Sequence, residues 1–320
     1  MPPRLAKLLA LIVAAALIGG AFWYRSRNDD GGDAGPGDGP SRSGDLTIAC
    51  VSELSEVCEG LEDVKVTIED AGTTATALAA FDGGPPPFDA WVTLDPWPEM
   101  VDVVRRVDQR SDLFDEPTAV GSMATAILSF ASVVEDLSSE CAEVSWSCLG
   151  ENAGPQSKVA IPPADSATGV LLAGQAASSR LETTSFDREA ILDPPSQTGL
   201  KRLLGSSSSR DATAPVRMVQ QGPAAFIAAG TGEPVARAAT LTQQGRQREM
   251  VVLDPEPAAS FRVVVAPLVS GERADRAIAL LTGNTGVAAL RNVDWTVPAA
   301  DGGTGLPEAG VLVALRQEID

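Results

Sequence analysis

The sequence predicts an α/β protein whose strands and helices alternate and whose strands form mostly parallel sheets. Hydrophobic residues make up 44% of the 320 positions but aromatic residues only 4%, so small aliphatic side chains must fill a core between helices and sheets. Short apolar runs alternate with helical patterns in the first third of the chain, and this alternation restarts in the middle. Such spacing predicts right-handed crossovers, with loops at the carboxyl ends of the strands free to contact a ligand.

Charge and composition exclude several classes of function. The formal net charge of −19 repels phosphate backbones, and no run of Lys and Arg interrupts it, so we expect no nucleic-acid partner. The chain has no histidine, which removes the commonest general base, the Ser-His and Cys-His nucleophile pairs and histidine-ligated metal sites. We therefore expect no enzyme, no cofactor and no metal.

The amino-terminal segment predicts membrane attachment. Residues 8–24 are apolar, follow Arg4 and Lys7, and end in the interfacial pair Trp23 and Tyr24. We predict a signal anchor over residues 1–27 that forms one transmembrane helix. A cleaved signal peptide is the alternative, although the small residues at 19–21 match the A-x-A pattern poorly. No cysteine follows the apolar run, which argues against a lipoprotein-type anchor.

Residues 28–44 consist mainly of Gly, Asp, Pro and Ser and predict a flexible linker. The folded part should begin at Leu46. We expect it to lie outside the cytoplasm on a single-pass cell-membrane protein.

Four cysteines fall into two close pairs, Cys50 with Cys58 and Cys141 with Cys148. Close pairs are typical of local disulfides in an oxidising compartment, which agrees with export. A metal site of four thiolates is an alternative that lacks the usual C-x-x-C spacing, and buried free thiols are another.

The first βα units can be placed in order. We predict a buried strand at 46–51, a short helix at 53–61, an alternating strand at 64–68, a helix through 78–81 capped by Thr73 or Thr74, and a strand at 88–94. The apolar stretch 123–134 predicts a strand that leaves this sheet and enters another.

The second series of elements follows the same logic. We predict strands at 158–161, 224–228 and 261–265, helices at 166–181 and 199–204, and a turn at 230–233. Residues 274–290 have the period of an amphipathic helix with a Gly-Asn-Thr-Gly interruption. Residues 311–315 fit either a strand or a short helix.

Four segments carry a resemblance to a known family. They are LTIACVSELSEVCEGL, FDAWVTLDPWPEMV, SKVAIPPADSATGVLLAGQAA and FRVVVAPLVSGERADRAIALL. Their order resembles the type 2 periplasmic, or extracellular, solute-binding proteins, the group that includes molybdate- and sulfate-like binding proteins. The resemblance implies two lobes, each a mostly parallel sheet flanked by helices, with hinge crossovers near 119–129 and 254–265. Lobe 1 would comprise residues 45–121 and 255–320, and lobe 2 residues 122–254.

Candidate ligand contacts lie mainly at predicted helix starts. Ser166, Thr168 and Gly169 begin a helix whose free backbone N–H groups can hold a carboxylate or oxyanion, although Asp165 or Ser166 can equally be a plain helix cap. Thr73 and Thr74 make the same kind of site in the first lobe.

The first loop offers Ser52, followed by Glu53, whose carboxylate opposes a doubly charged oxyanion. Asp95 and Trp97 together suit a cation or an amphipathic ligand, unless Trp97 is a lid on the core. Ser122 and Gln220 are further candidates. Trp146 is expected to pack against the second disulfide.

A Ser166–Lys158 nucleophile pair is disfavoured because a strand and a turn separate the two residues. We therefore expect an extracytoplasmic protein that captures a small solute between two lobes for transport or signalling, with a transporter or envelope protein as partner. The alternative is a degenerate, non-binding scaffold of the cell envelope. An open polar cleft would favour solute capture, and a cleft filled by the protein's own side chains would favour the scaffold.

Overall fold

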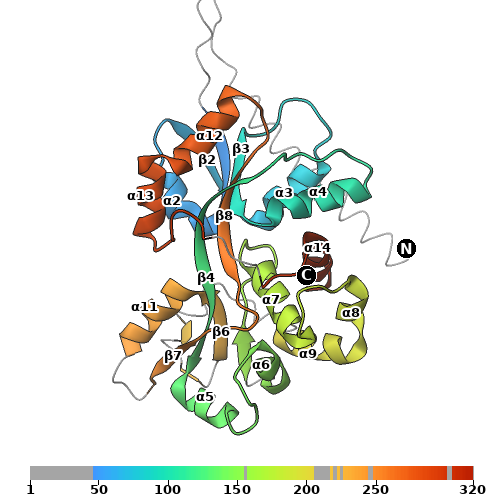
Figure 1. Ribbon diagram of the computed structural model, residues 1–320, viewed down its shortest axis with the longest axis vertical. Coiled ribbons are helices and arrows are strands. Elements are labelled where there is room, and N and C mark those ends of the chain that lie inside the picture. Colours follow the sequence, from blue (N-terminus) through green and yellow to red (C-terminus); the bar gives the residue numbers. More distant parts are fainter. Residues whose placement is uncertain are drawn as a thin grey trace, which may run out of the picture. The chain divides into compact units, whose positions relative to one another are not determined.

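The computed structural model describes residues 46–154, 157–204, 217–218, 222–223, 226–243, 248–300 and 305–319, within one compact unit, Asp45–Asp320 (Figure 1). The predicted anchor at 1–27 and linker at 28–44 lie outside these residues. Among the residues described, none of the helices is both long enough and apolar enough to cross a membrane.

The first group of strands is mainly parallel. Strand β1 (Leu46–Val51) lies between β2 (Val64–Glu69) and β3 (Ala90–Leu94), parallel to both, and β8 (Ser260–Pro267) adds to β3 in the antiparallel sense. Strands β1 and β3 are almost entirely buried, as apolar runs covered on both faces should be, whereas β2 alternates in burial. The three strands predicted at 46–51, 64–68 and 88–94 are confirmed to within two residues.

Strand β4 (Thr118–Phe130) joins this group to a second one. Its first part pairs with β8, and its second part pairs with β6 (Phe226–Gly232) and β7 (Met250–Leu253). The prediction that one strand leaves the first sheet and enters another is therefore confirmed. The hydrogen-bonded order β2-β1-β3-β8-β4-β6-β5 is continuous, because β4 belongs to both groups.

The prediction of a mostly parallel second sheet is wrong. Strand β5 (Lys158–Ala160) is parallel to β6, but β4 is antiparallel to both β6 and β7. Strand β4 comes into the second group directly from the first group. Strands β6 and β7 lie on either side of its second part and run in the opposite direction.

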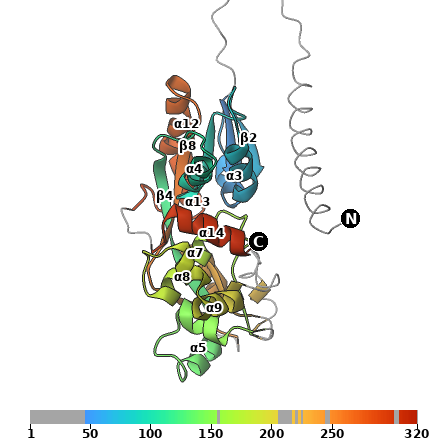
Figure 2. The same cartoon turned by 90° about the vertical axis from the view of Figure 1, so that its right-hand side faces the viewer.

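Helices cover both groups of strands. Beside β1, β2, β3 and β8 lie α2 (Ser55–Glu59), α3 (Ala71–Ala80), α4 (Trp97–Val107), α12 (Glu272–Thr282) and α13 (Asn284–Asn292), and we call this part half A. Helices α12 and α13 cover one side of its sheet and α3 and α4 the other (Figures 1 and 2). The predicted interruption in 274–290 is confirmed as the break at Gly283 between α12 and α13.

The described part of half B contains β5, β6 and β7 with six helices. These are α5 (Ala131–Leu137), α6 (Trp146–Asn152), α7 (Gly169–Leu181), α8 (Arg188–Leu192), α9 (Pro194–Leu204) and α11 (Glu233–Gln243). The predicted turn at 230–233 is wrong, because β6 continues to Gly232 and α11 begins at the next residue.

The last helix, α14 (Ala309–Ile319), lies between the halves. It packs against α4 of half A and against α7 and α8 of half B (Figure 2). The ambiguous segment 311–315 is thus helical. A single hydrophobic cluster runs from Ile48 in β1 through Trp97 and Leu312 to Leu171 in α7, and so includes both halves.

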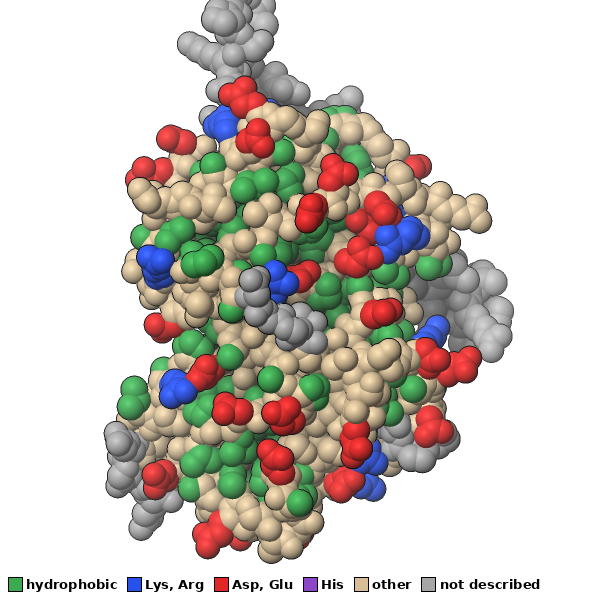
Figure 3. Space-filling model, viewed as in Figure 1, with side chains coloured by type: hydrophobic (Ala, Val, Ile, Leu, Met, Phe, Trp, Pro, Cys, Tyr) green, Lys and Arg blue, Asp and Glu red, His purple; other side chains and the backbone are tan. Residues whose placement is uncertain are grey.

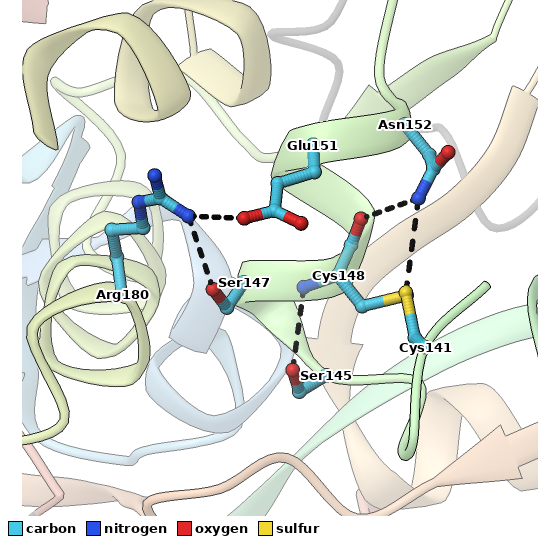
Figure 4. A network of polar contacts seen from close by, with 7 residues as sticks. All are labelled: Cys141, Ser145, Ser147, Cys148, Glu151, Asn152 and Arg180. Atoms are coloured by element: carbon cyan, nitrogen blue, oxygen red, sulfur yellow. Dashed lines mark hydrogen bonds and ion pairs between the residues drawn. A yellow bond between two sulfur atoms is a disulfide. The ribbon is translucent and has the colours of Figure 1, made fainter. Parts of the chain in front are cut away.

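Both predicted disulfides are present. Cys50–Cys58 joins the end of β1 to α2, and Cys141–Cys148 joins α6 to the loop before it. Asn152 donates a hydrogen bond to the Cys148 carbonyl over 3.1 Å, within a polar network that also includes Arg180 (Figure 4). Trp146 is fully buried, as expected of a packing residue.

Candidate functional site

The candidate site lies where loops of half A meet the start of α7 in half B. The Gly72 N–H in α3 donates a 2.8 Å hydrogen bond to the Asp165 carbonyl. A Cβ on Gly72 would lie 2.0 Å from Asp165 Oδ1, so any larger residue would force the Asp165 side chain to move. The prediction that Thr73 or Thr74 caps this helix is wrong: α3 begins at Ala71, and Asp70 is the N-cap.

Glu53 reaches across from the first loop to the start of α7. Its Oε1 accepts a 3.3 Å hydrogen bond from the Thr168 N–H. Burial raises the pKa of the Glu53 carboxyl, and backbone N–H groups, including those of Ala167 and Thr168, only partly oppose this effect. The helix start that the sequence predicts as an anion-binding site is therefore occupied by the Glu53 carboxyl of the chain itself.

Trp97 makes a third contact between the halves. Its side chain is fully buried, and its Nε1–H donates to the Ala167 carbonyl over 2.9 Å. Its ring meets Trp91 edge-on at 6.4 Å between centroids, within the core of half A. Of the two roles that the sequence allows for Trp97, contact with a ligand or cover of the hydrophobic core, its position in the structure matches the second.

Arg316, on α14, lies beside these contacts. Its guanidinium forms an ion pair with Asp165 at 2.6 Å and also donates to the Gly72 carbonyl at 3.1 Å. The same group stands over the Trp97 ring, 5.5 Å from its centroid. No local pattern in the sequence points to Arg316, because it lies in a helix far from the other site residues along the chain.

A crevice of about 700 Å³ lies beside α4 and the start of α14. Its polar lining includes three carboxylates and one guanidinium, namely Asp95, Glu99, Glu308 and Arg106. A second groove of about 430 Å³ lies among α3, α4 and α14 and is mostly apolar. The face in Figure 3 carries more acidic than basic side chains, in line with the net charge.

Asp95 ends β3 and lines the crevice. Burial raises the pKa of its carboxyl, and the Arg262 guanidinium at 3.5 Å opposes that rise. Arg262 stands opposite Ser122 in the β4–β8 pairing. Its Nε is buried and has no hydrogen-bond partner within the described part of the chain. Sequence reasoning missed Arg262, whose only signal is a lone charge in the apolar run FRVVVAP.

The other predicted contacts have partners within the protein. Ser52 Oγ donates to Asp70 at 2.8 Å, and Thr74 Oγ1 donates to Glu69 at 3.1 Å, while Thr73 is exposed. Ser122 accepts a 2.9 Å hydrogen bond from Ala300 N–H, so it secures the segment that leads to α14.

The helix predicted from 166 begins at Gly169, and its N-cap is Thr168, whose side chain makes no capping hydrogen bond. Ser166 Oγ, three residues before the helix, accepts from the Gly169 N–H at 3.0 Å. A Cβ on Gly169 would lie 1.9 Å from the Pro163 carbonyl, so this position has no room for a side chain. Gln220 lies outside the described residues. Within the described ranges, no cluster of Cys, Asp or Glu could hold a metal ion.

Two α/β halves that share a long strand form the type 2 fold of the periplasmic solute-binding proteins. The structure of AfuA from Actinobacillus pleuropneumoniae, with fructose-6-phosphate bound, matches 86% of this chain and 95% of AfuA, at 14% identity and a TM-score of 0.55. Iron-bound HitA from Pseudomonas aeruginosa matches 86% of this chain and 98% of HitA, at 14% identity and a TM-score of 0.53.

The resemblance in fold predicted from four sequence segments is thereby confirmed, while the molybdate- and sulfate-like subtype stays a prediction. No family model matches the chain, and no curated protein matches it.

Proposed function

We propose that this chain is an extracytoplasmic solute-binding protein, tethered by residues 1–27, that holds a small polar solute in the crevice between halves A and B. The observation that carries the proposal is Arg262, whose Nε is buried and unbonded among the described residues, beside Asp95 at the crevice. A buried guanidinium N–H without an acceptor costs free energy, and a solute oxygen would remove that cost.

The lining sets the chemistry of the solute. Asp95, Glu99 and Glu308 in the lining offer acceptors. Donors would come from Arg106 in the lining and from Arg262, which is paired with Asp95 behind it. A solute with both acceptor and donor groups, such as a sugar or an amino acid, matches this combination better than a simple anion does. The fold neighbours agree with this only in general terms, since AfuA holds fructose-6-phosphate and HitA holds iron.

Solute capture would use the strand crossings as hinges. The crossing segments are β4 and the connection from β7 to β8, and the lobes would be residues 45–121 with 255–320, and residues 122–254. A transporter or another envelope protein would then recognise the closed state. Such a role needs no catalytic group.

The test is thermal unfolding of the full-length chain in detergent with a panel of sugars, amino acids and inorganic anions. At least one solute should raise Tm, and the rise should grow with the logarithm of its concentration above Kd. Arg262→Gln should abolish that shift, whereas Arg237→Gln, which alters an exposed ion pair on α11, should preserve it. A panel that leaves the wild-type Tm unchanged contradicts the proposal.

A second candidate is a non-binding scaffold of the cell envelope. It is favoured by Glu53, Trp97 and Arg316, which fill the junction between the halves with the protein's own groups. This candidate predicts that neither the wild type nor Arg262→Gln responds to any solute in the panel.

A further inference from the structure

The amides that join the two halves have no other hydrogen-bonding role. Gly72 is the second residue of α3, and Thr168 precedes the first residue of α7, so neither N–H has a partner within its helix. Each instead donates across the junction, Gly72 to the Asp165 carbonyl and Thr168 to the Glu53 carboxylate. Separation of the halves would leave both N–H groups to water.

Helix α14 reinforces the same junction through one side chain. Arg316 binds Asp165 of half B at 2.6 Å and the Gly72 carbonyl of half A at 3.1 Å, so a single guanidinium connects both halves. The Asp165 side chain is half exposed, and the Arg316 side chain is 22% exposed, so this ion pair is only partly screened by solvent.

Apolar packing holds α14 in place. Leu312 and Leu315 are both buried. A Cβ on Gly174 of α7 would lie 2.4 Å from Leu312 Cδ2, so the two helices are in close contact there. On the other side, Val313 and Arg316 line a groove together with α3 and α4. Helix α14 therefore packs into the space between the halves.

We propose that α14, with Arg316 as its bridging residue, is a built-in clasp that keeps halves A and B closed when no solute is bound. Opening of the junction would break the described contacts Gly72–Asp165, Thr168–Glu53 and Arg316–Asp165 together. This inference concerns the unliganded protein and does not depend on solute capture.

Hydrogen–deuterium exchange of the full-length chain in detergent, without added solute, tests the clasp at single-residue resolution. In the wild type, the amides of Gly72 and Thr168 should be protected. Arg316→Gln should make both exchange about tenfold faster, because it removes a charge-assisted bridge, while amides within β1 and β3 should not change. Arg237→Gln on α11 is the matched control and should behave as wild type.

Gly72→Ala provides a second, independent variant. The added methyl would lie 2.0 Å from Asp165 Oδ1 and 2.7 Å from Arg316 Nη2. Alanine favours helix α3, so an increase in exchange at Thr168 cannot result from a weaker helix. Gly310→Ala in α14, where a Cβ would have no atom within 4 Å, should leave Thr168 protected.

Two outcomes overturn the clasp. One is rapid exchange of Gly72 and Thr168 in the wild type, and the other is unchanged protection in both Arg316→Gln and Gly72→Ala. If Arg316→Gln does not fold, Gly72→Ala decides the question alone. Because no solute is present, none of these results bears on the solute-binding proposal, which the thermal panel tests separately.

Discussion

Two carboxyl groups of half A have pKa values shifted in opposite directions, and their partners explain the difference. Burial raises the pKa of Glu53, because its hydrogen bonds come mainly from neutral backbone groups. Burial also acts on Asp89, but hydrogen bonds from Arg273 at 2.6 Å and from the Thr47 N–H at 2.8 Å lower its pKa overall. The Glu53 pKa therefore makes closure of the junction depend on pH, and the Asp89 pKa makes the free energy of unfolding depend on pH.

The Glu53 shift predicts that acid favours the closed junction. Opening of the junction would return the Glu53 carboxyl toward its ordinary pKa of 4.5. At a pH between this value and the raised pKa of the closed state, opening therefore releases a proton. The protonation of Glu53 therefore favours closure fully below its ordinary pKa of 4.5, and this effect is lost as pH rises through the raised pKa of the closed state. Thr168 exchange, corrected for its intrinsic pH dependence, should therefore slow as pH falls through that window.

Glu53→Gln keeps an acceptor for Thr168 but does not titrate, so its corrected exchange should not vary with pH. Glu56→Gln, at an exposed position in the following helix α2, should retain the wild-type pH dependence. An identical pH dependence in Glu53→Gln and wild type would refute this assignment.

Asp89→Asn should destabilise the protein near neutral pH by about 1–3 kcal/mol, because it weakens hydrogen bonds made to a charged group. Since folding lowers the Asp89 pKa from 3.8, its contribution is present above that value and is lost as pH falls through the lowered one. In urea unfolding of the full chain, the difference in free energy of unfolding between Asp89→Asn and wild type should shrink as pH is lowered. Asp82→Asn, an exposed control, should show no such difference at either pH.

At the scale of elements, the first disulfide fixes the loop that carries Glu53. Cys50 and Cys58 bracket residues 52–54, the short 3₁₀ turn between β1 and α2. The second disulfide closes a loop of nearly the same length, with a separation of 7 residues against 8. The two bonds should therefore restrict the unfolded chain to a similar extent but act on different parts of the fold.

Replacing either cysteine pair by serine should lower the free energy of unfolding by about 2–3 kcal/mol. Loss of Cys50–Cys58 should in addition accelerate exchange at Thr168, because the loop that positions the Glu53 carboxylate becomes less restricted. Loss of Cys141–Cys148 should leave Thr168 unaffected. Equal effects of the two pairs on Thr168 would contradict a role for the first disulfide at the junction.

The elements predicted best are those whose patterns are local. The Leu46–Val51 strand is an uninterrupted apolar run, and the break between α12 and α13 follows from Gly283. Helix α4 was not predicted, because its start, Trp97-Pro98, reads as the end of a strand and a turn. The turn predicted at 230–233 is instead the end of β6, because the glycines at 230 and 232 suggest a loop although they pack closely against Trp146 and Met123. Helix α11 was not predicted.

At the scale of the whole molecule, one hydrophobic cluster spans both halves through Trp97 and Leu312. Two halves connected only by strands would be expected to unfold with some independence. A shared core instead makes each half stabilise the other, so we expect cooperative unfolding of the folded part.

Leu312→Ala should lower stability by about 2–5 kcal/mol, as expected for a cavity at a fully buried leucine, and should broaden or split the calorimetric transition of the full chain. Leu241→Ala on α11 makes the same chemical change at a side chain that is 71% exposed, and should leave both Tm and transition width unchanged. A Leu312→Ala transition that is lowered but stays single would show that coupling of the halves does not depend on this contact.

The sequence by itself determined the α/β class, the two disulfides, the long crossing strand and, to within three residues, the helix that begins at Gly169, because each depends on residues close together along the chain. Only the tertiary structure decided that Glu53 would occupy that helix start, that Arg262 would lie beside Asp95, and that α14 would pack between the halves. These contacts join residues separated by more than a hundred positions. Their partners are chosen by the packing of whole elements, which no local pattern records.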